Sequence, residues 1–390
     1  MKKIYLDYAA TSPVDPSVVK AMLPYLTDKF GNTMSLHSFG QEAKIALEKS
    51  REVVANLIGA KPNEIIFTGS ATESNNMVLK GLPVGRQGIK GNPAHLAGRH
   101  IIISSIEHPC IIETAEWLEK KGVKVTRIPV DKKGLINPLD IEKAITKDTT
   151  LVSIIHGSNE IGTIQPIEEI GKICKKHNVY FHTDAVQTFG KVPIDIANID
   201  LLTASSHKIC GPKGVACLFI KEGVGIEPLL HGGGQENGLR SSTVNVAGVV
   251  GFAKACQLCA EEREKEGLRL TKLRDKIIKN VLKIDKAYLT GHNKKRLPNN
   301  ASFIFSFIEG ESLAIQLDLN GIAVSTGSAC SSMKLEPNHV LLATGLKPAE
   351  AHGSLRVSLG RWTTEEDIDQ LIKILPGIVN KLREISPYGK

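Results

Sequence analysis

The stretch between residues 64 and 220 alternates short apolar runs with helical patterns, and this alternation constrains the fold more than any other feature. Short runs rich in Ile, Val and Leu predict buried strands, whereas apolar residues three or four positions apart predict helices. Strands that alternate with helices form a mostly parallel sheet covered on both faces. The predicted strands are Glu64–Thr68, His100–Ser104, Val123–Ile128, Leu151–Ile155, Val179–His182, Leu201–Ala204 and Val215–Ile220.

After residue 244 the alternation gives way to long helical patterns and then to a shorter mixture of strands and helices. We therefore predict a large domain over residues 13–262 and a smaller α+β domain built from residues 1–12 and 263–390. The elements predicted in this second part are helices Val246–Cys259, Leu268–Leu282, Glu311–Asn320 and Glu365–Leu382 and strands Ala301–Phe307, Ile322–Val324 and Leu355–Ser358.

The composition argues against nucleic-acid and membrane partners. The net charge is +8, but 49 basic residues are interspersed with 41 acidic ones, as on solvated helical faces. No run approaches the roughly 20 apolar residues of a membrane span. The seven cysteines are scattered and odd in number, so we expect free thiols in a reducing, cytoplasmic compartment. Cys256 and Cys259 have CxxC spacing but lie in a helical pattern, which disfavours a zinc or redox role.

Polar side chains follow five of the predicted strands. In parallel sheets, ligands bind beyond the carboxyl ends of the strands, so these side chains should meet at one edge. They are Thr72, Glu107, His108, His156, Asn159, Asp184, Gln187, Ser205, His207 and Lys208.

Lys208 lies between a predicted strand and a tight glycine turn, Gly211–Gly214, which suits a lysine that must meet a carbonyl cofactor. Pyridoxal phosphate fits the surrounding residue types. Asp184 could stabilise its protonated ring nitrogen, and Thr72 at a helix start could help to bind its phosphate. Ser205 and His207 could be further hydrogen-bond donors to the cofactor, and Gln187 could donate to its phenolic oxygen. Asn159 could hold the cofactor and the substrate in register. His108 could stack on the ring and shuttle a proton.

A second centre is predicted in a loop of small polar residues at about 325–334, which carries Cys330. A cysteine on a Gly/Ser-rich loop is exposed and free to move, as a nucleophile requires. Arg356 lies in a predicted strand, and a buried arginine is costly unless paired. A substrate carboxylate is a natural partner for it.

The chain resembles cysteine desulfurases of the NifS/IscS type, in the class V aminotransferase group of fold-type I pyridoxal-phosphate enzymes. The resemblance implies a large domain with a seven-stranded, mostly parallel sheet between helices and a smaller α+β domain. The matching blocks run in family order along the chain: Tyr8–Thr11, Phe67–Asn76, Glu107–His108, Asn159–Pro166, His182–Gln187, Ser205–Gly214, His231–Gln235, Arg240–Thr243 and Gly327–Ser332.

By this resemblance, Lys208 forms the covalent link to the cofactor aldehyde, and His108 stacks on the ring. Asp184 faces the ring nitrogen, Gln187 and Asn159 serve the phenolic oxygen, and Arg356 receives the substrate carboxylate. The residues implied to hold the phosphate are Ala71, Thr72, Ser205 and His207, with Thr243 reaching the phosphate of a neighbouring subunit. The resemblance therefore also implies a homodimer with shared active sites.

By the same resemblance, the reaction converts L-cysteine into L-alanine and leaves a persulfide on Cys330. The length of the chain between Cys330 and Arg356 resembles the subgroup that passes sulfur to an iron–sulfur scaffold protein of the IscU type. Transfer to a tRNA-thiolating enzyme, and Cys330 as a transient [2Fe–2S] ligand shared with the scaffold, are further implications. Three alternatives stay open: a selenocysteine lyase, a transaminase and a sulfur-relay scaffold.

Several positions depart from the family pattern. Gly69-Ser70 reverses a common order beside the phosphate, and Asn237 replaces an arginine. Ser242 replaces a glycine that could need a left-handed backbone. Proline follows His108, at Pro109.

Overall fold

The computed structural model describes residues 3–81, 98–327 and 337–386. Cys330, the predicted sulfur acceptor, lies outside the described residues. Within those three ranges no helix combines the length and apolar character that a membrane crossing requires.

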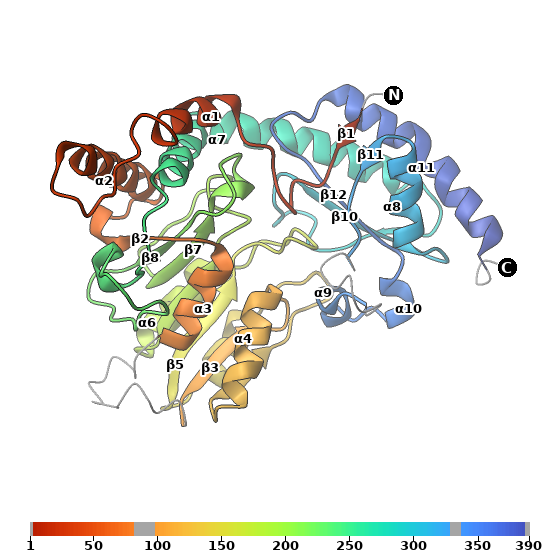
Figure 1. Cartoon of the computed structure of the whole chain (residues 1–390). Coiled ribbons are helices and arrows are strands. Elements are labelled where there is room, and N and C mark those ends of the chain that lie inside the picture. Colours follow the sequence, from red (N-terminus) through yellow and green to blue (C-terminus); the bar gives the residue numbers. More distant parts are fainter. Residues whose placement is uncertain (1–2, 82–97, 328–336, 387–390) are drawn as a thin grey trace.

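The central element is a seven-stranded sheet in the order β2-β8-β7-β6-β5-β3-β4 (Figure 1). Only β8 runs antiparallel to its neighbours, so the sheet is mostly parallel, as predicted. The strands are β2 (Ile65–Thr68), β3 (His100–Ser104), β4 (Lys124–Ile128), β5 (Thr149–Ile155), β6 (Tyr180–Asp184), β7 (Leu201–Ser205) and β8 (Ala216–Ile220).

Helices cover both faces of this sheet because successive strand residues point to opposite sides. In β3, Ile102 packs into one core cluster while Ile101 and Ile103 pack into the other. The first face is covered by α2 (Ser38–Ile58), α5 (Pro138–Ala144), α6 (Ile167–Lys176) and the first half of α7 (Val246–Val281), and α1 (Pro16–Met22) packs on α7. The second face is covered by α3 (Ala71–Gly81) and α4 (Pro109–Glu119), seen in front of the sheet in Figure 1.

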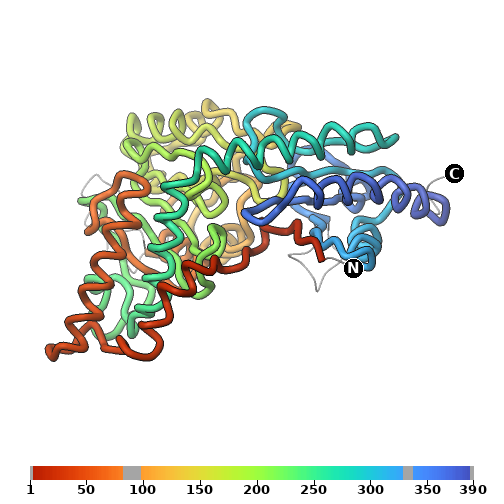
Figure 2. The backbone as a smooth tube through the Cα atoms, turned by 90° about the horizontal axis from the view of Figure 1, so that it is seen from above, coloured from red at the N-terminus to blue at the C-terminus, as the bar shows by residue number. Residues whose placement is uncertain are grey.

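A second core is built around two smaller sheets. One is antiparallel, in the order β12-β10-β9, and the other is a parallel pair, β1-β11. The pairing of β1 with β11 brings the N-terminus to the C-terminal half of the chain, as Figure 2 shows. The elements are β1 (Ile4–Tyr5), β9 (Ala287–Leu289), β10 (Asn300–Phe305), β11 (Ile322–Ala323), β12 (Ser354–Ser358), α8 (Gly310–Leu319), α9 (His339–Ala343), α10 (Pro348–Ala351) and α11 (Glu365–Ile385).

The structure corrects the prediction of two helices after residue 244. A single helix, α7, runs from Val246 to Val281, and its residues pack into both cores. Figure 2 shows the backbone of this helix as one continuous element. The charged segment around residue 262 breaks the apolar periodicity, but its Glu, Arg and Lys side chains are good helix formers. The predicted domain boundary at residue 262 lies inside this helix and stays a prediction. The short elements β9, α9 and α10 were not predicted, because they are too short to show a repeating pattern of apolar residues.

A buried ion pair connects Glu236, in the loop before α7, to Arg51 on α2. Arg51 Nη1 lies 2.7 Å from Glu236 Oε2, and their side chains are 7% and 2% exposed. The same carboxylate oxygen accepts a hydrogen bond from the Phe67 backbone N–H in β2. Glu236 thus gives Arg51 its one buried carboxylate partner within the described residues, and it also accepts from a buried backbone N–H.

We predict that Glu236→Gln lowers the free energy of unfolding by about 3–5 kcal/mol, because the buried Arg51 charge loses its buried partner and keeps only Glu48, which is half exposed. Urea unfolding followed by circular dichroism measures the effect. Glu222→Gln is the matched control, since Glu222 pairs with Lys61 where both side chains are more than half exposed. The control should leave the unfolding midpoint nearly unchanged. Equal shifts in the two variants would contradict the prediction.

Candidate active site

A cavity of about 710 Å³ lies at the carboxyl edge of the large sheet and extends to β12 of the second core. It brings together all the predicted cofactor and substrate residues except Thr243; Cys330 lies outside the description. The predicted residues that line it are Ala71, Thr72, His108, Asn159, Asp184, Gln187, Ser205, His207, Lys208 and Arg356. Strands far apart in the sequence therefore place most of the predicted polar groups around one cavity. Glu107 and His156, which were predicted at the same edge, are not among its lining residues.

The Lys208 side chain leaves a tight turn, η3 (Ser206–Lys208), directly after β7. Its Nζ donates hydrogen bonds to the carbonyl oxygens of Ala9 and Ala10, both at 2.6 Å. The turn needs glycine at position 211, because a Cβ there would lie 2.0 Å from Ser206 Oγ. The lysine amine is therefore held at a fixed place in the cavity.

Asp184 is the last residue of β6. The strand therefore extends past His182, where the predicted strand ended. Its Oδ2 accepts a hydrogen bond of 2.7 Å from Asn75 Nδ2, and its Oδ1 accepts one of 3.0 Å from the Val186 backbone N–H. These donors fix the carboxylate plane. Asn75 was not predicted as a site residue, although its place one turn after Thr72 on α3 was a usable signal.

His108 is the N-cap residue of α4, and Pro109 occupies the first helical position, where proline is favoured. The departure from the family pattern at Pro109 is thereby explained. His108 Nδ1 accepts a hydrogen bond of 3.2 Å from the Cys110 backbone N–H, so the neutral ring carries its hydrogen on Nε2. Burial lowers the pKa of His108, and it raises the pKa of the Cys110 thiol to about 12. Cys110 is thus a thiol and not a nucleophile.

The end of the cavity beneath α3 can bind a phosphate. Ala71 and Thr72 are the first residues of that helix, whose first-turn N–H groups have no intrahelical partner. Across the cavity, His207 Nδ1 lies 3.0 Å from Thr11 Oγ1. Burial lowers the pKa of His207 to about 4, so the ring is neutral at neutral pH. Ser205, buried at the end of β7, completes this end.

Arg356 lies on β12 at the opposite end, between two carboxylates. Its Nη1 is 2.7 Å from Glu160 Oε1, and its Nη2 is 3.1 Å from Asp7 Oδ1. Asn159 Nδ2 also donates to Glu160 Oε1, at 2.6 Å. Asp7 and Glu160 were not predicted, because nothing local in the sequence ties them to Arg356. The backbone of Arg356 exchanges two hydrogen bonds with Ser325, the start of the predicted cysteine loop.

Thr243 lines a separate hollow of about 160 Å³ on the far side of Gly214. The neighbouring Ser242 does not have a positive φ, in contrast with Asn237, whose φ is +58°. Asparagine tolerates that left-handed conformation well. Neither substitution therefore strains the backbone of this loop.

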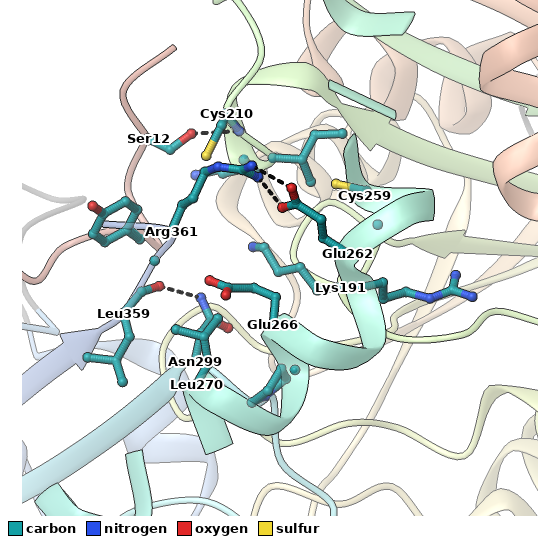
Figure 3. Close-up of a pocket in the computed structure, with 18 of the residues that line it drawn as sticks. Ser12, Lys191, Cys210, Cys259, Glu262, Glu266, Leu270, Asn299, Leu359 and Arg361 are labelled. Carbon is teal, nitrogen blue, oxygen red and sulfur yellow. Dashed lines mark hydrogen bonds and ion pairs between the residues drawn. The ribbon is translucent and has the colours of Figure 1, made fainter. Parts of the chain in front are cut away.

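A small cavity of about 80 Å³ lies behind the lysine turn, as Figure 3 shows. Arg361 crosses it to an ion pair of 2.6 Å with Glu262. Burial lowers the pKa of Lys191 to about 8 and raises the pKa of the Cys259 thiol to about 12. Among the residues that the structure describes, no three His, Cys, Asp or Glu side chains could hold a metal ion.

A model of the aminotransferase class-V family matches residues 4–371. The chain belongs to this family. It is 50% identical over 390 residues to a protein of Dictyoglomus turgidum named cysteine desulfurase IscS, covering 99% of this chain and 97% of that one. It is 46% identical over 391 residues to the mitochondrial cysteine desulfurase of Saccharomyces cerevisiae, covering 99% and 77% of the two chains.

Solved structures agree with these relatives. A NifS-like protein superposes with a TM-score of 0.88 at 39% identity, covering 97% of this chain and all of that one. A structure described as SspA in complex with cysteine superposes with a TM-score of 0.81 at 34% identity, covering 93% and 100%. Class-V family enzymes use pyridoxal phosphate. The cavity fits that cofactor, because a fixed lysine amine, an oriented carboxylate and a helix N-terminus line it together.

Glu107 is a fully buried carboxyl next to His108. Its Oε1 accepts hydrogen bonds from Ser104 Oγ and from the Ile155 backbone N–H. Burial raises its pKa from 4.5 to about 8. The folded protein therefore holds this proton at pH values where the unfolded chain has released it.

We predict that this proton makes stability fall as pH rises. The contribution is complete below about pH 4.5 and is lost as pH rises through about 8, because the folded pKa is raised. Stability should fall by up to about 1.4 kcal/mol per pH unit within this window. In Glu107→Gln, a neutral isostere, urea midpoints should fall less between pH 6 and pH 8.5. Parallel slopes for the two proteins would refute the assignment.

Proposed function

We propose that the chain is a pyridoxal-phosphate-dependent cysteine desulfurase that converts L-cysteine into L-alanine and a persulfide on Cys330. The observation that carries this proposal is one cavity lined by the Lys208 amine, the Asp184 carboxylate and the Arg356 guanidinium. Relatives of equal length that are named cysteine desulfurases support it.

Each end of the cavity has a task in this reaction. The backbone amide N–H groups at the α3 N-terminus, with Ser205 and His207, bind the phosphate, and the Arg356 guanidinium binds the substrate carboxylate. The substrate Cα then lies between these ends, near Lys208. When bound, the cofactor supplies an electron sink for the carbanion at Cα. Asp184 stabilises the protonated ring nitrogen that this role requires.

Lys208 and His108 carry out the proton transfers of this reaction. The Lys208 amine is the base that removes the Cα proton. The carbonyl oxygens of Ala9 and Ala10 hold this amine in place. His108 carries hydrogen on Nε2 when neutral, because its Nδ1 accepts from the α4 backbone. It can therefore donate a proton from the ring-stacking position. Gln187 and Asn159 orient the phenolic oxygen of the cofactor, and Asn159 also orients the substrate.

Cys330 is the proposed sulfur acceptor. Its thiolate attacks the substrate sulfur, forming an S–S bond while the bond from sulfur to Cβ breaks; the carbon fragment keeps that electron pair and takes up a proton at Cβ, which gives L-alanine. Ser325, which lines the cavity, is five residues before Cys330. Five extended residues span at most about 17 Å, so Cys330 can reach the cavity from this anchor.

The persulfide is proposed to pass to an iron–sulfur scaffold protein of the IscU type, with a tRNA-thiolating enzyme as a second acceptor. Relatives named IscS support the first acceptor. Cys330 would also be the residue that ligates a [2Fe–2S] cluster transiently with that scaffold.

A homodimer with shared active sites is the proposed assembly. Large apolar side chains are exposed between α1 and α2, and Leu36 reaches 93% exposure. Soluble monomers rarely expose a contiguous apolar patch of this kind. Thr243 lies outside the cavity of its own chain, which suits a residue that serves the neighbouring subunit's phosphate. The apolar residues of this patch are Leu26, Phe30, Met34, Leu36 and Phe39.

We predict that Cys330→Ala binds L-cysteine but forms no persulfide, since the nucleophile is lost while the cavity is intact. Absorbance of the bound cofactor reports substrate binding, and a persulfide-specific label with L-alanine quantification reports turnover. Cys259→Ala is the matched control and should keep full activity. Lys208→Ala should lack the absorbance band of the cofactor linked covalently to the lysine. Alanine release at the wild-type rate from Cys330→Ala would rule out this role.

We predict that Leu36→Asp with Phe39→Asp shifts the protein from dimer to monomer and lowers activity, because charges replace the apolar contact. Light scattering after gel filtration measures the mass. Ile315→Asp on α8 is the control, since Ile315 is 60% exposed but lies away from the patch. A double variant that remains dimeric and fully active would exclude this interface.

A further inference from the structure

The two carboxylates that hold Arg356 differ in their relation to the cavity. Glu160 is 7% exposed and is not among the cavity-lining residues, and Asn159 Nδ2 donates to the same Oε1 atom. Asp7 is 19% exposed and lines the cavity. Glu160 is therefore a buried anchor on Nη1, whereas Asp7 faces the space in which a substrate would bind.

The contact that Asp7 makes is the contact that a substrate needs. A carboxylate binds a guanidinium through its terminal N–H groups, and Nη1 is already engaged by the anchor. Nη2 is the atom that Asp7 Oδ1 contacts, at 3.1 Å. Nη2 carries two N–H groups, and Asp7 occupies one of them. A substrate carboxylate that binds Nη2 from the cavity therefore brings a second negative charge to the same atom and competes with Asp7 for it.

We propose that Asp7 occupies the substrate-carboxylate position on Arg356 in the resting protein and thereby lowers the affinity for amino acids. This inference rests on the proposed function, in which Arg356 receives the substrate carboxylate. Asp7 is on this view an affinity-determining residue that the substrate displaces.

The surroundings of Asp7 allow its side chain, but not its backbone, to move. The segment is pinned to β12, because the Ser358 N–H donates to Leu6 O and the Ala9 N–H donates to Ser358 Oγ, both at 2.8 Å. Rotation of the Asp7 side chain, which is 19% exposed and lines the cavity, can therefore release Arg356 while the backbone stays in place.

The charged groups around Asp7 determine how easily its side chain leaves Arg356. Burial raises the pKa of Asp7, while the nearby cations Arg356 and Lys208 lower it. Tyr5 and Glu160 are the other titratable groups within range. Arg356 and Asp7 are 4% and 19% exposed, and a substrate carboxylate would replace the charge that Asp7 withdraws, so we expect a net change in affinity of about 2- to 5-fold. The competition therefore tunes substrate affinity without preventing binding.

The test measures equilibrium binding of L-alanine, the product, to the holoenzyme by isothermal titration calorimetry. Asp7→Asn should bind L-alanine about 2- to 5-fold more tightly, because the competing charge is gone and the shape is kept. L-Alaninamide, which lacks the carboxylate, should bind wild type and variant equally. Asp7→Ser serves as a second neutral variant, and circular dichroism confirms folding. The KM for L-cysteine should fall in parallel in both variants.

Two further variants separate this inference from the proposed function. Glu160→Gln, which removes the anchor, should weaken L-alanine binding, in contrast with Asp7→Asn. Arg356→Lys should weaken it strongly if Arg356 is the carboxylate receptor. Unchanged binding in Arg356→Lys would overturn that role. Weakened binding in Arg356→Lys, with unchanged or weaker binding in Asp7→Asn and Asp7→Ser, would overturn the competition alone.

Discussion

The active site depends on hydrogen bonds made by one short stretch of chain, residues 7–12, which lies between the two cores. Its carbonyl oxygens at Ala9 and Ala10 hold the Lys208 amine, and Ala9 O also accepts from Gln187 Nε2 at 2.9 Å. Ser12 Oγ donates to the carbonyl of His207. Hydrogen bonds to a charged group contribute about 1.5–3 kcal/mol each, so the lysine contacts are among the strongest in this region. The stretch therefore sets the positions of catalytic groups from both halves of the chain.

Periodicity predicted most of the fold because the strands of the large sheet are buried on both faces. Runs such as Leu151–Ile155 cannot be stable elsewhere than in a core, and the polar residues after them then meet at one edge. The resemblance to a family assigned roles to these residues. What escaped prediction depends on contacts between distant parts of the chain. Asp7 meets Arg356 across almost the entire sequence, and no local pattern records such a pair. The continuity of α7 escaped for a related reason, since its two halves pack into different cores.

Neutral groups lie in the cavity wall and directly behind it. Burial keeps His207 unprotonated and Cys110 a thiol in the wall, and behind it Glu107 holds a proton up to a pKa of about 8. The charged side chains that line the cavity are Lys208, Lys213, Asp184, Asp7 and Arg356, with Glu160 buried behind Arg356. This distribution suits a zwitterionic amino acid, whose carboxylate and amine each find one charged partner. A wall with additional charged histidines or thiolates would bind other anions and cations as well.

The single helix α7 has a mechanical consequence. Its 36 residues form a rod of about 54 Å. Phe252 in its first half packs in the core of the large sheet, and Ile277 in its second half packs in the other core. A hinge between the two halves would have to bend this rod, breaking backbone hydrogen bonds or uncovering one of its packed faces. We therefore expect the cavity to keep a constant width through the catalytic cycle. Substrates would enter by rearrangement of side chains and loops at its rim, and not by the closing of two lobes on each other.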